Sequence, residues 1–272
     1  MQTTRILFIG AGRMAQAIVH GLVQQNDEPV WDITVTNRAN SKRLTALKER
    51  YGVRTVTDWS GEVTKSDVIV LAMPPEDHAE VLTVLHGLVE TQLVVSVAAG
   101  IGVSGLAQAL KPETSVAWVM PNTAAGIGES MTLYACGQHV TGAQHATLTA
   151  LLSGLGRYQA CSEAQIRGLT AITGSASAFV FRMAQVLEQM AMTYGIEEKA
   201  ARMMVGQMML GSAKLILAGG QPLALADEVT TPGGVTAAGI AVLEEGRMDD
   251  LIHRAVLAAN ERADQLRVSQ DP

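Results

Sequence analysis

Short apolar runs recur through the first 120 residues of the chain, and helical patterns lie between most of them. Brief apolar runs between turn signals are typical of parallel strands that are buried on both faces of a sheet. Six such runs lie at residues 5–9, 33–36, 54–56, 68–72, 93–97 and 116–119. Strands and helices that alternate in this way predict an α/β fold with a doubly wound sheet.

The pattern changes at about Ser162. Strand signals almost vanish after this residue, and Ser162-Glu163-Ala164-Gln165 has the spacing of a capping box at a helix start. Long helical patterns follow at residues 175–194, 197–217 and 248–266. We therefore expect two domains, a Rossmann-type sheet domain at residues 1–161 and an all-helical domain at residues 162–272.

The helical pattern at residues 197–217 is apolar around much of its circumference. A helix with so little polar surface has to be buried on several sides. Its apolar residues are Met203, Met204, Val205, Met208, Met209, Leu210, Leu215, Ile216 and Leu217. The helical domain is too small for its own core to cover them all, so we expect a contact between subunits.

Composition and charge argue against several classes of function. The formal net charge is −6 and no basic patch is apparent, which argues against a nucleic-acid partner. The longest uncharged run, residues 91–110, is broken by serines and glycines, so we expect no membrane span.

The cysteines, the histidines and the first residues add further expectations. Cys136 and Cys161 give no disulfide framework, and the six histidines have no metal-ligand spacing. The first residues lack the apolar core of a signal peptide. We expect a cytoplasmic protein without a metal.

The first apolar run leads directly into Gly10-Ala11-Gly12-Arg13-Met14-Ala15 and then into a helical pattern. This is the G-x-G-x-x-A fingerprint in the strand–turn–helix context that dinucleotide binding requires. Gly10 makes the turn, Gly12 admits the pyrophosphate, and Ala15 lies where helix and strand pack closely. We expect a dinucleotide crevice here, completed by the loops after the second, fourth, fifth and sixth runs.

The end of the second apolar run bears on the choice of cofactor. An acid at this place usually holds a free ribose 2′-hydroxyl. Asn37 and Arg38 stand there instead, with Lys42 nearby, and a guanidinium suits a phosphate by charge and geometry. We expect NADP(H) in preference to NAD(H). The alternative is a surface arginine that only caps the loop.

A second candidate site is the turn at residues 230–236, which reads Thr-Thr-Pro-Gly-Gly-Val-Thr and leads into a helical pattern. The first turn of a helix offers free N–H groups and the positive end of the helix dipole, which suit a small anion such as a carboxylate. Three threonine hydroxyls surround this place. The alternative is an ordinary glycine-rich turn.

Over nearly its whole length the chain resembles the pyrroline-5-carboxylate reductase family. The most specific marker is the stretch from Val229 to Thr236, which runs into Leu243-Glu244. Other markers lie at residues 10–15, 96–100, 120–123 and 172–175. Members reduce the cyclic imine of pyrroline-5-carboxylate to proline with NAD(P)H, the last step of proline biosynthesis. The resemblance implies a homodimer formed through the C-terminal helices, and such dimers can assemble further into rings.

The resemblance also implies roles for individual residues. Thr236 is the implied catalytic residue and hydrogen-bonds the ring nitrogen of a small imino-acid substrate. The implied substrate-binding residues are Thr230, Thr231, Pro232, Gly233, Gly234, Val235 and Ser175. The implied cofactor-binding residues are Gly10, Ala11, Gly12, Arg13, Met14, Ala15, Asn37, Arg38, Ala72, Met73, Pro74, Ala98 and Asn122. Strong acids or bases are not needed, because hydride transfer to an imine mainly requires that two ligands are positioned.

Several positions depart from the family pattern, and they leave the substrate open. The departures are Arg13 for Asn, Pro74 for Lys, Trp118 for Arg, Ala176-Ser177 for Gly-Pro, Phe179 for Tyr, and a missing Glu near Gly219. The alternatives are a reductase of another cyclic imine and a catalytically silent NADP-binding regulatory relative. A hydroxyacid dehydrogenase is disfavoured, because Lys199 and Lys214 lack the Asn four residues later that such enzymes use.

Overall fold

The computed structural model describes residues 3–25 and 30–268. The chain forms two compact units. The first comprises Met1–Gly174 together with Asn260–Pro272, and the second comprises Ser175–Ala259. Among the helices of the described residues, none has the length and apolar character that a bilayer crossing demands.

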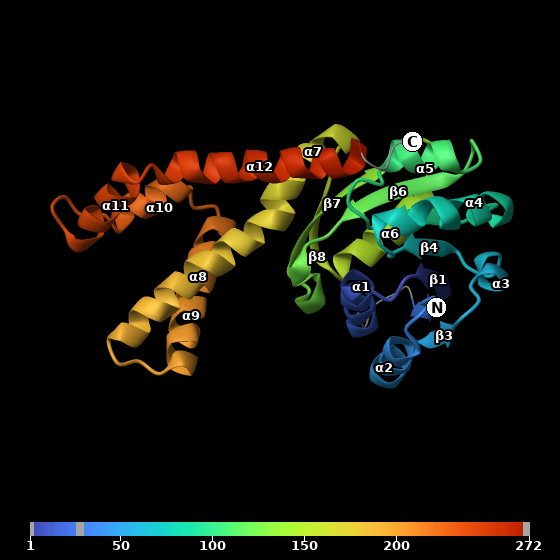
Figure 1. Cartoon of the computed structure of the whole chain (residues 1–272), viewed down its shortest axis with the longest axis horizontal. Coiled ribbons are helices and arrows are strands. Elements are labelled where there is room, and N and C mark those ends of the chain that lie inside the picture. The colour runs from blue at the N-terminus through green and yellow to red at the C-terminus, as the bar shows by residue number, and fades with distance from the viewer. Residues whose placement is uncertain (1–2, 26–29, 269–272) are drawn as a thin grey trace. The chain divides into compact units, whose positions relative to one another are not determined.

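The first unit is built on one sheet, whose described residues form eight strands in the order β3-β2-β1-β4-β5-β6-β7-β8 (Figure 1). All neighbouring strands are parallel except β6 and β7. The strands are β1 Thr3–Ile9, β2 Val30–Thr36, β3 Arg54–Val56, β4 Val68–Leu71, β5 Leu93–Ser96, β6 Ser115–Met120, β7 Ser130–Cys136 and β8 Gly156–Ala160. The doubly wound sheet and all six expected strands are confirmed, whereas β7 and β8 were not expected.

Helices cover both faces of this sheet. They are α1 Arg13–Gln24, α2 Ser41–Tyr51, α3 Ser60–Val63, η1 Pro75–Asp77, α4 His78–Leu88, α5 Val103–Ala109, η2 Thr123–Ile127, α6 Gly142–Ser153 and α7 Glu163–Thr170. Alternate residues of β1 enter opposite cores, Ile6 and Phe8 with α1, α2 and α6, and Leu7 and Ile9 with α3, α4 and α5. This alternation follows from the two-residue period of a strand.

The capping box at Ser162 is confirmed and begins α7, which packs on the sheet. Ile166 of this helix is fully buried in a small core with Trp118 and Leu133 of β6 and β7. The first unit therefore runs past residue 161, where the sequence analysis places the domain boundary. A π-helical turn, Ala171–Ser175, follows α7.

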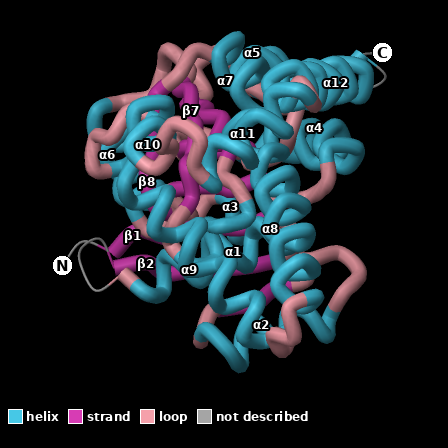
Figure 2. Tube along the Cα trace, turned by 90° about the vertical axis from the view of Figure 1, so that its left-hand side faces the viewer, coloured by secondary structure: helices cyan, strands magenta, loops and turns pink. Residues whose placement is uncertain are grey.

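The regular elements that the structure describes in the second unit are all helices (Figure 2). Its helices are α8 Ala176–Thr193, α9 Glu198–Leu217, α10 Pro222–Glu228, α11 Val235–Glu245 and the first part of α12 Met248–Val268. The helices expected from the sequence are confirmed, and α8 and α9 are joined through Gly195 in a left-handed conformation with φ 83°. Only Ala201 and Val205 are buried among the described residues of this unit.

Hydrogen bonds tie together the loops at the carboxyl ends of the parallel strands. Gly10 N donates to Thr36 O at 3.0 Å, Ala72 N to Ile9 O at 2.9 Å, and Val97 N to Leu71 O at 3.1 Å. The loops after β1, β2, β4 and β5 therefore begin side by side. Ligands of doubly wound sheets bind beyond this edge.

Candidate functional site

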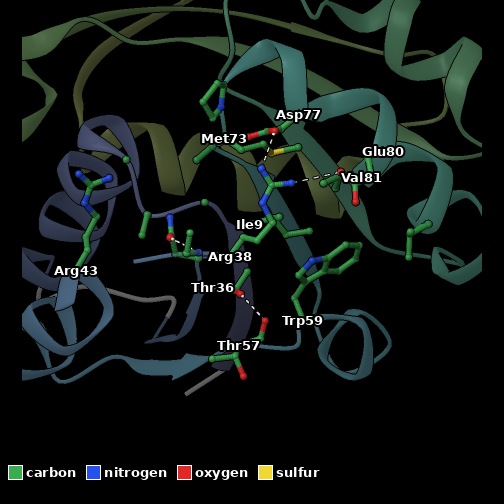
Figure 3. A pocket seen from close by; sticks show the side chains of 18 residues that line it. Ile9, Thr36, Arg38, Arg43, Thr57, Trp59, Met73, Asp77, Glu80 and Val81 are labelled. Atoms are coloured by element: carbon green, nitrogen blue, oxygen red, sulfur yellow. Dashed lines mark hydrogen bonds and ion pairs between the residues drawn. The ribbon is translucent and has the colours of Figure 1, made fainter. Parts of the chain in front are cut away.

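A crevice of about 470 Å³ opens at this edge, where the loops after β1, β2, β3 and β4 meet α4 (Figure 3). Its lining includes eight of the residues that the sequence analysis assigns to a cofactor. These are Gly10, Ala11, Gly12, Asn37, Arg38, Ala72, Met73 and Pro74. A nucleotide-sized space and the expected loops thus coincide at one place.

The first loop of the crevice is shaped by two glycines with different constraints. Gly10 has φ +109°, and a Cβ there would lie 2.6 Å from the backbone of Ala72 and Met73. Gly12 is the N-cap of α1, without a side-chain cap, and a Cβ there would meet only Ala72 O at 3.6 Å. Gly10 is thus required by the fold itself. Gly12 leaves the N-terminus of α1 open to an anion such as a pyrophosphate.

Asn37 shapes the second loop from within. Its Oδ1 accepts hydrogen bonds from Ala39 N at 3.2 Å and Asn40 N at 2.8 Å. Asn40 in turn caps α2, because its Oδ1 accepts from Arg43 N at 2.9 Å. These turns fix the backbone of the segment between β2 and α2, so its side chains extend from defined positions.

Arg38 extends into the crevice from this segment and is exposed over 75% of its side chain. Its two terminal nitrogens lie 3.4 Å from Asp77 Oδ1 and 3.4 Å from Glu80 Oε2 (Figure 3). Arg43, from the first turn of α2, also lines the crevice, whereas Lys42 does not. Arg43 and both acids are not among the site residues expected from the sequence.

Further lining residues come from β3 and α4. Thr57 and Trp59 follow β3, and Val81 and Val84 lie on α4. Trp59 presents an aromatic ring, a group on which a purine base can stack. The third apolar run of the sequence was a signal for this loop, since it predicts that another strand ends at the same edge.

The remaining residues of the cofactor assignment lie outside the lining of this crevice. Arg13 is exposed, Met14 is half-buried and Ala15 is fully buried, as close packing of α1 on β1 requires. Ala98 is buried, and its carbonyl accepts a hydrogen bond from Trp118 Nε1 at 2.9 Å. The roles of these residues in cofactor binding stay predictions.

The side-chain amide of Asn122 also makes hydrogen bonds within the fold. Its Oδ1 accepts from Ala124 N at 2.9 Å, and its Nδ2 donates to Thr173 O at 2.9 Å. The amide thus ties the loop after β6 to the turn after α7. One amide hydrogen and one oxygen lone pair remain for a ligand.

The loop after β5 and residues of β6 itself line a second cavity of about 290 Å³, which shares no lining residue with the first. Its walls include Trp118, Met120 and Arg167. The guanidinium of Arg167 lies 5.5 Å from the centre of the Trp118 ring. Arg167 also pairs with Glu163, which accepts from Ser104 N at 2.9 Å. A cation from α7 thus lies beside the position where the resembled family has an arginine.

His78 lies behind the loop that carries Pro74. It is 1% exposed, and its Nδ1 lies 3.1 Å from Pro74 O. A carbonyl can only accept, so Nδ1 carries the proton. Burial lowers the pKa of His78 below its ordinary value of 6.5, which favours the neutral ring. A neutral imidazole is thus hydrogen-bonded to the carbonyl of Pro74, a residue of the crevice lining.

The Thr/Pro/Gly turn of the second unit has the geometry that the sequence analysis expects. Gly233 is left-handed with φ +70°, and Gly234 N donates to Thr231 O at 2.9 Å. Gly234 is the N-cap of α11, and no side chain of the described residues caps it. Ala238 N makes the first helical bond, to Gly234 O at 3.2 Å. The N–H groups of the three preceding residues are therefore outside the helical ladder.

The threonines of this turn differ in the contacts and the exposure of their side chains. Thr230 Oγ1 donates to Ala226 O at 2.7 Å and so closes the end of α10. A Cβ on Gly234 would lie 2.3 Å from Thr231 Oγ1, so a larger residue there would displace that hydroxyl. Thr236 lies in the first turn of α11 and is exposed. Ser175 ends the π-helical turn and is exposed.

Comparison with known families covers both parts of the chain. Residues 163–266 match the model described as pyrroline-5-carboxylate reductase dimerisation. Residues 5–100 match the model described as NADP oxidoreductase, coenzyme F420-dependent. The chain thus combines a nucleotide-binding model with a dimerisation model.

Individual relatives match along nearly the whole chain. Pyrroline-5-carboxylate reductase 2 of Bacillus subtilis is 33% identical over 264 residues, which are 97% of this chain and 95% of the relative. Pyrroline-5-carboxylate reductase of Pasteurella multocida is 36% identical over 276 residues, with 98% of each chain covered.

Solved structures share the fold. A pyrroline-5-carboxylate reductase from Coxiella burnetii superposes with a TM-score of 0.87 at 31% identity, covering 97% of this chain and 99% of that one. Plasmodium falciparum pyrroline carboxylate reductase with NADP bound superposes with a TM-score of 0.88 at 23% identity, covering 98% and 99%. At that identity, the second structure speaks for the fold alone.

Proposed function

The chain belongs to the pyrroline-5-carboxylate reductase family, and we propose that it reduces 1-pyrroline-5-carboxylate to L-proline with NADPH. This is an oxidoreductase reaction on a C=N bond and the last step of proline biosynthesis. A similar sequence over 97% of the chain, with both the nucleotide-binding and the dimerisation parts matched, supports it.

The observation that carries this proposal is the turn before α11. It joins a left-handed glycine, a side-chain-free N-cap and three N–H groups outside the helical ladder. The substrate is an imino acid whose carboxylate needs N–H donors and positive potential, which a helix N-terminus supplies. We assign the carboxylate to the turn from Thr230 to Val235, and retain Ser175 as a substrate contact.

The hydroxyl of Thr236 is assigned to the ring nitrogen of the substrate. A threonine hydroxyl is a poor acid, so Thr236 orients the ring and relays a proton that water can supply. When bound, NADPH supplies the hydride, which goes to the imine carbon. The protein then has to position the two ligands, and it needs no strong acid or base for this.

The crevice of the first unit fits the cofactor. Gly10 and Gly12 leave the N-terminus of α1 open to the pyrophosphate, and Trp59 provides a ring for the adenine. We assign Arg38 to the ribose 2′-phosphate and therefore expect NADP(H) to bind better than NAD(H). The remaining assigned residues (Ala11, Arg13, Met14, Ala15, Asn37, Ala72, Met73, Pro74, Ala98 and Asn122) complete the cofactor site in this proposal.

The assembly we propose is a homodimer through the C-terminal helices. Its support is the matched dimerisation model at residues 163–266 and the many exposed apolar side chains of α8, α9 and α11. We propose residues 1–161 as the nucleotide-binding domain and residues 162–272 as the dimerisation domain, with α7 of the latter packed on the sheet. We further propose that dimers assemble into rings and that the enzyme works in the cytoplasm.

Steady-state consumption of NADPH tests the function. The purified protein is supplied with the five-membered imine pyrroline-5-carboxylate, or with the six-membered imine that has one more methylene. The proposal predicts much faster turnover of the five-membered ring. One methylene changes the discrimination in a fitted pocket by about 10- to 200-fold.

This comparison is needed because Ala176, Ser177 and Phe179 depart from the family pattern and leave the substrate open. Turnover of only the six-membered ring would replace the proposed substrate with another cyclic imine. Tight NADPH binding without turnover of either ring would instead favour a silent regulatory relative.

A further inference from the structure

Four charged side chains line the crevice assigned to the cofactor. Arg38 follows β2, Arg43 lies in the first turn of α2, Asp77 ends η1, and Glu80 lies in the first turn of α4. All four line the same cavity (Figure 3). Two cations and two anions thus share the space that an adenosine ribose and its 2′-phosphate would enter.

The two acids engage Arg38 loosely. Each contact is a single nitrogen–oxygen approach of 3.4 Å, and the side chains of Arg38 and Glu80 are about three-quarters exposed. Such exposed pairs contribute little free energy and are easily exchanged. A phosphate dianion carries more charge and three strong acceptor oxygens, so it can take Arg38 away from them.

The acids nevertheless oppose the phosphate after this exchange. Asp77 and Glu80 remain in the lining, so they repel the incoming dianion. An acid in this region also suits a free 2′-hydroxyl, whose proton it can accept. Both effects favour NADH over NADPH.

Arg43 has no competing partner among the described residues. No ion pair joins it to an acid there, and Figure 3 shows dashed lines from Arg38 but none from Arg43. Its backbone N–H is held by Asn40, at the positive end of α2. Arg43 is therefore a second cation that reaches the crevice without having to leave an acid.

We propose that these four residues set the cofactor preference: Arg43 and Arg38 bind the 2′-phosphate, while Asp77 and Glu80 compete with it for Arg38. This inference rests on the proposed binding of NADP(H) in the crevice. It predicts that the protein prefers NADPH to NADH, but less strongly than it would if the two arginines acted without the two acids.

The role of the acids is tested with the double variant Asp77→Asn, Glu80→Gln in the full-length protein. Dissociation constants of NADPH and NADH are measured by fluorescence titration without imine. Removing two negative charges at this range should tighten NADPH binding about three- to tenfold. NADH binding should stay unchanged or weaken. The control is Glu76→Gln, since Glu76 does not line this crevice, and its constants should match the wild type.

The role of Arg43 is tested by Arg43→Gln beside Lys42→Gln, a neighbouring cation outside the lining. Arg43→Gln should weaken NADPH binding about tenfold, the effect of a lost charge-assisted contact, and leave NADH unaffected. Lys42→Gln should change neither constant.

The inference would be overturned if the variants changed the dissociation constants of NADPH and NADH equally, or if the Asp77→Asn, Glu80→Gln variant bound NADPH no more tightly than the wild type. It would also be overturned if Arg43→Gln and Lys42→Gln had the same effect, or if the wild type bound no NADPH. Because binding is measured without imine, its result is independent of turnover. If the expected ratios appear while no imine is reduced, the proposed function fails and this inference stands. If pyrroline-5-carboxylate is reduced and the ratios do not change, only this inference fails.

Discussion

Thr236 is the residue that we expect to contact the reacting ring directly. It is exposed in the first turn of α11, next to the N–H groups assigned to the carboxylate. Thr236→Ala should lower kcat/KM about 5- to 150-fold, which corresponds to a loss of about 1–3 kcal/mol of transition-state stabilisation, the range of one lost polar contact. Steady-state kinetics on pyrroline-5-carboxylate measure this. Thr236→Ser keeps the hydroxyl and should retain most of the activity, whereas wild-type kinetics in the alanine variant would remove the role.

Glu62 gives a prediction about stability. Its carboxylate lies 2.6 Å from Arg54 and 3.0 Å from Lys65, and these hydrogen bonds lower the pKa of Glu62 from 4.5 to about 2. They tie α3, which starts next to Trp59, to β3. A carboxylate with a lowered pKa in the folded state stabilises the fold above its unfolded pKa.

Glu62→Gln should therefore lower the free energy of unfolding at neutral pH by about 1 kcal/mol, because the exposed ends of Arg54 and Lys65 weaken the pairs through solvent screening. The difference from the wild type should shrink as the pH falls from 4.5 to about 2, where Glu62 becomes protonated. Urea titrations at several pH values measure it. A difference that persists unchanged at the acid end would show that Glu62 acts through packing instead.

Some site residues could be predicted from the sequence because their signals are local. The glycines at 10 and 12 and the pair Asn37-Arg38 follow directly from motifs after strands, and all four line the crevice. Arg43, Asp77 and Glu80 could not be found in this way. They meet only because parallel pairing brings the ends of β2 and β4 to one edge, and no local pattern records that pairing.

At the scale of elements, the turn between β1 and α1 separates the needs of the fold from those of the ligand. Gly10→Ala should destabilise the protein by about 3 kcal/mol or more, because a left-handed alanine would overlap the backbone after β4. Gly12→Ala should leave thermal stability nearly unchanged, since its Cβ has an ordinary contact distance, yet it should weaken NADPH binding. Melting temperatures and NADPH titrations of both variants measure this. Equal melting temperatures would contradict this division of roles.

Two strands, β7 and β8, were not expected from the sequence, and the reasons are physical. In β7, Ser130 and Thr132 are buried and hydrogen-bonded to each other at 3.0 Å, so the strand lacks a continuous apolar run. The edge strand β8, Gly156–Ala160, is largely exposed and needs few apolar residues. The six strands that were expected carry apolar side chains into the cores on the two sheet faces, which makes their pattern clear.

At the scale of the whole molecule, we expect the helical unit to pair with that of a second copy, as its match to a dimerisation model suggests. Met204 and Met208 are one turn apart on α9 and about half exposed, like many of its neighbours. The double variant Met204→Glu, Met208→Glu should shift the protein from dimer to monomer, because two charges on an interface that excludes water are strongly unfavourable. Light scattering after size-exclusion chromatography measures the mass.

Ile127→Glu is the matched control, since Ile127 is an apolar residue in the other unit and is 77% exposed. It should leave the dimer intact. Dissociation of both variants, or of neither, would contradict a dimer contact made by α9. The apolar circumference of this helix was readable from the sequence. The register of the contact was not, because it depends on a second copy of the chain.

The most direct test of the account follows the hydride. The enzyme is supplied with pyrroline-5-carboxylate and NADPH that carries deuterium at the transferable position, and the product is analysed by mass spectrometry and NMR. We expect L-proline with deuterium at the δ-carbon, the former imine carbon, formed in step with cofactor oxidation. Cofactor that is oxidised without labelled proline, or no reaction in protein that binds NADPH, would contradict it.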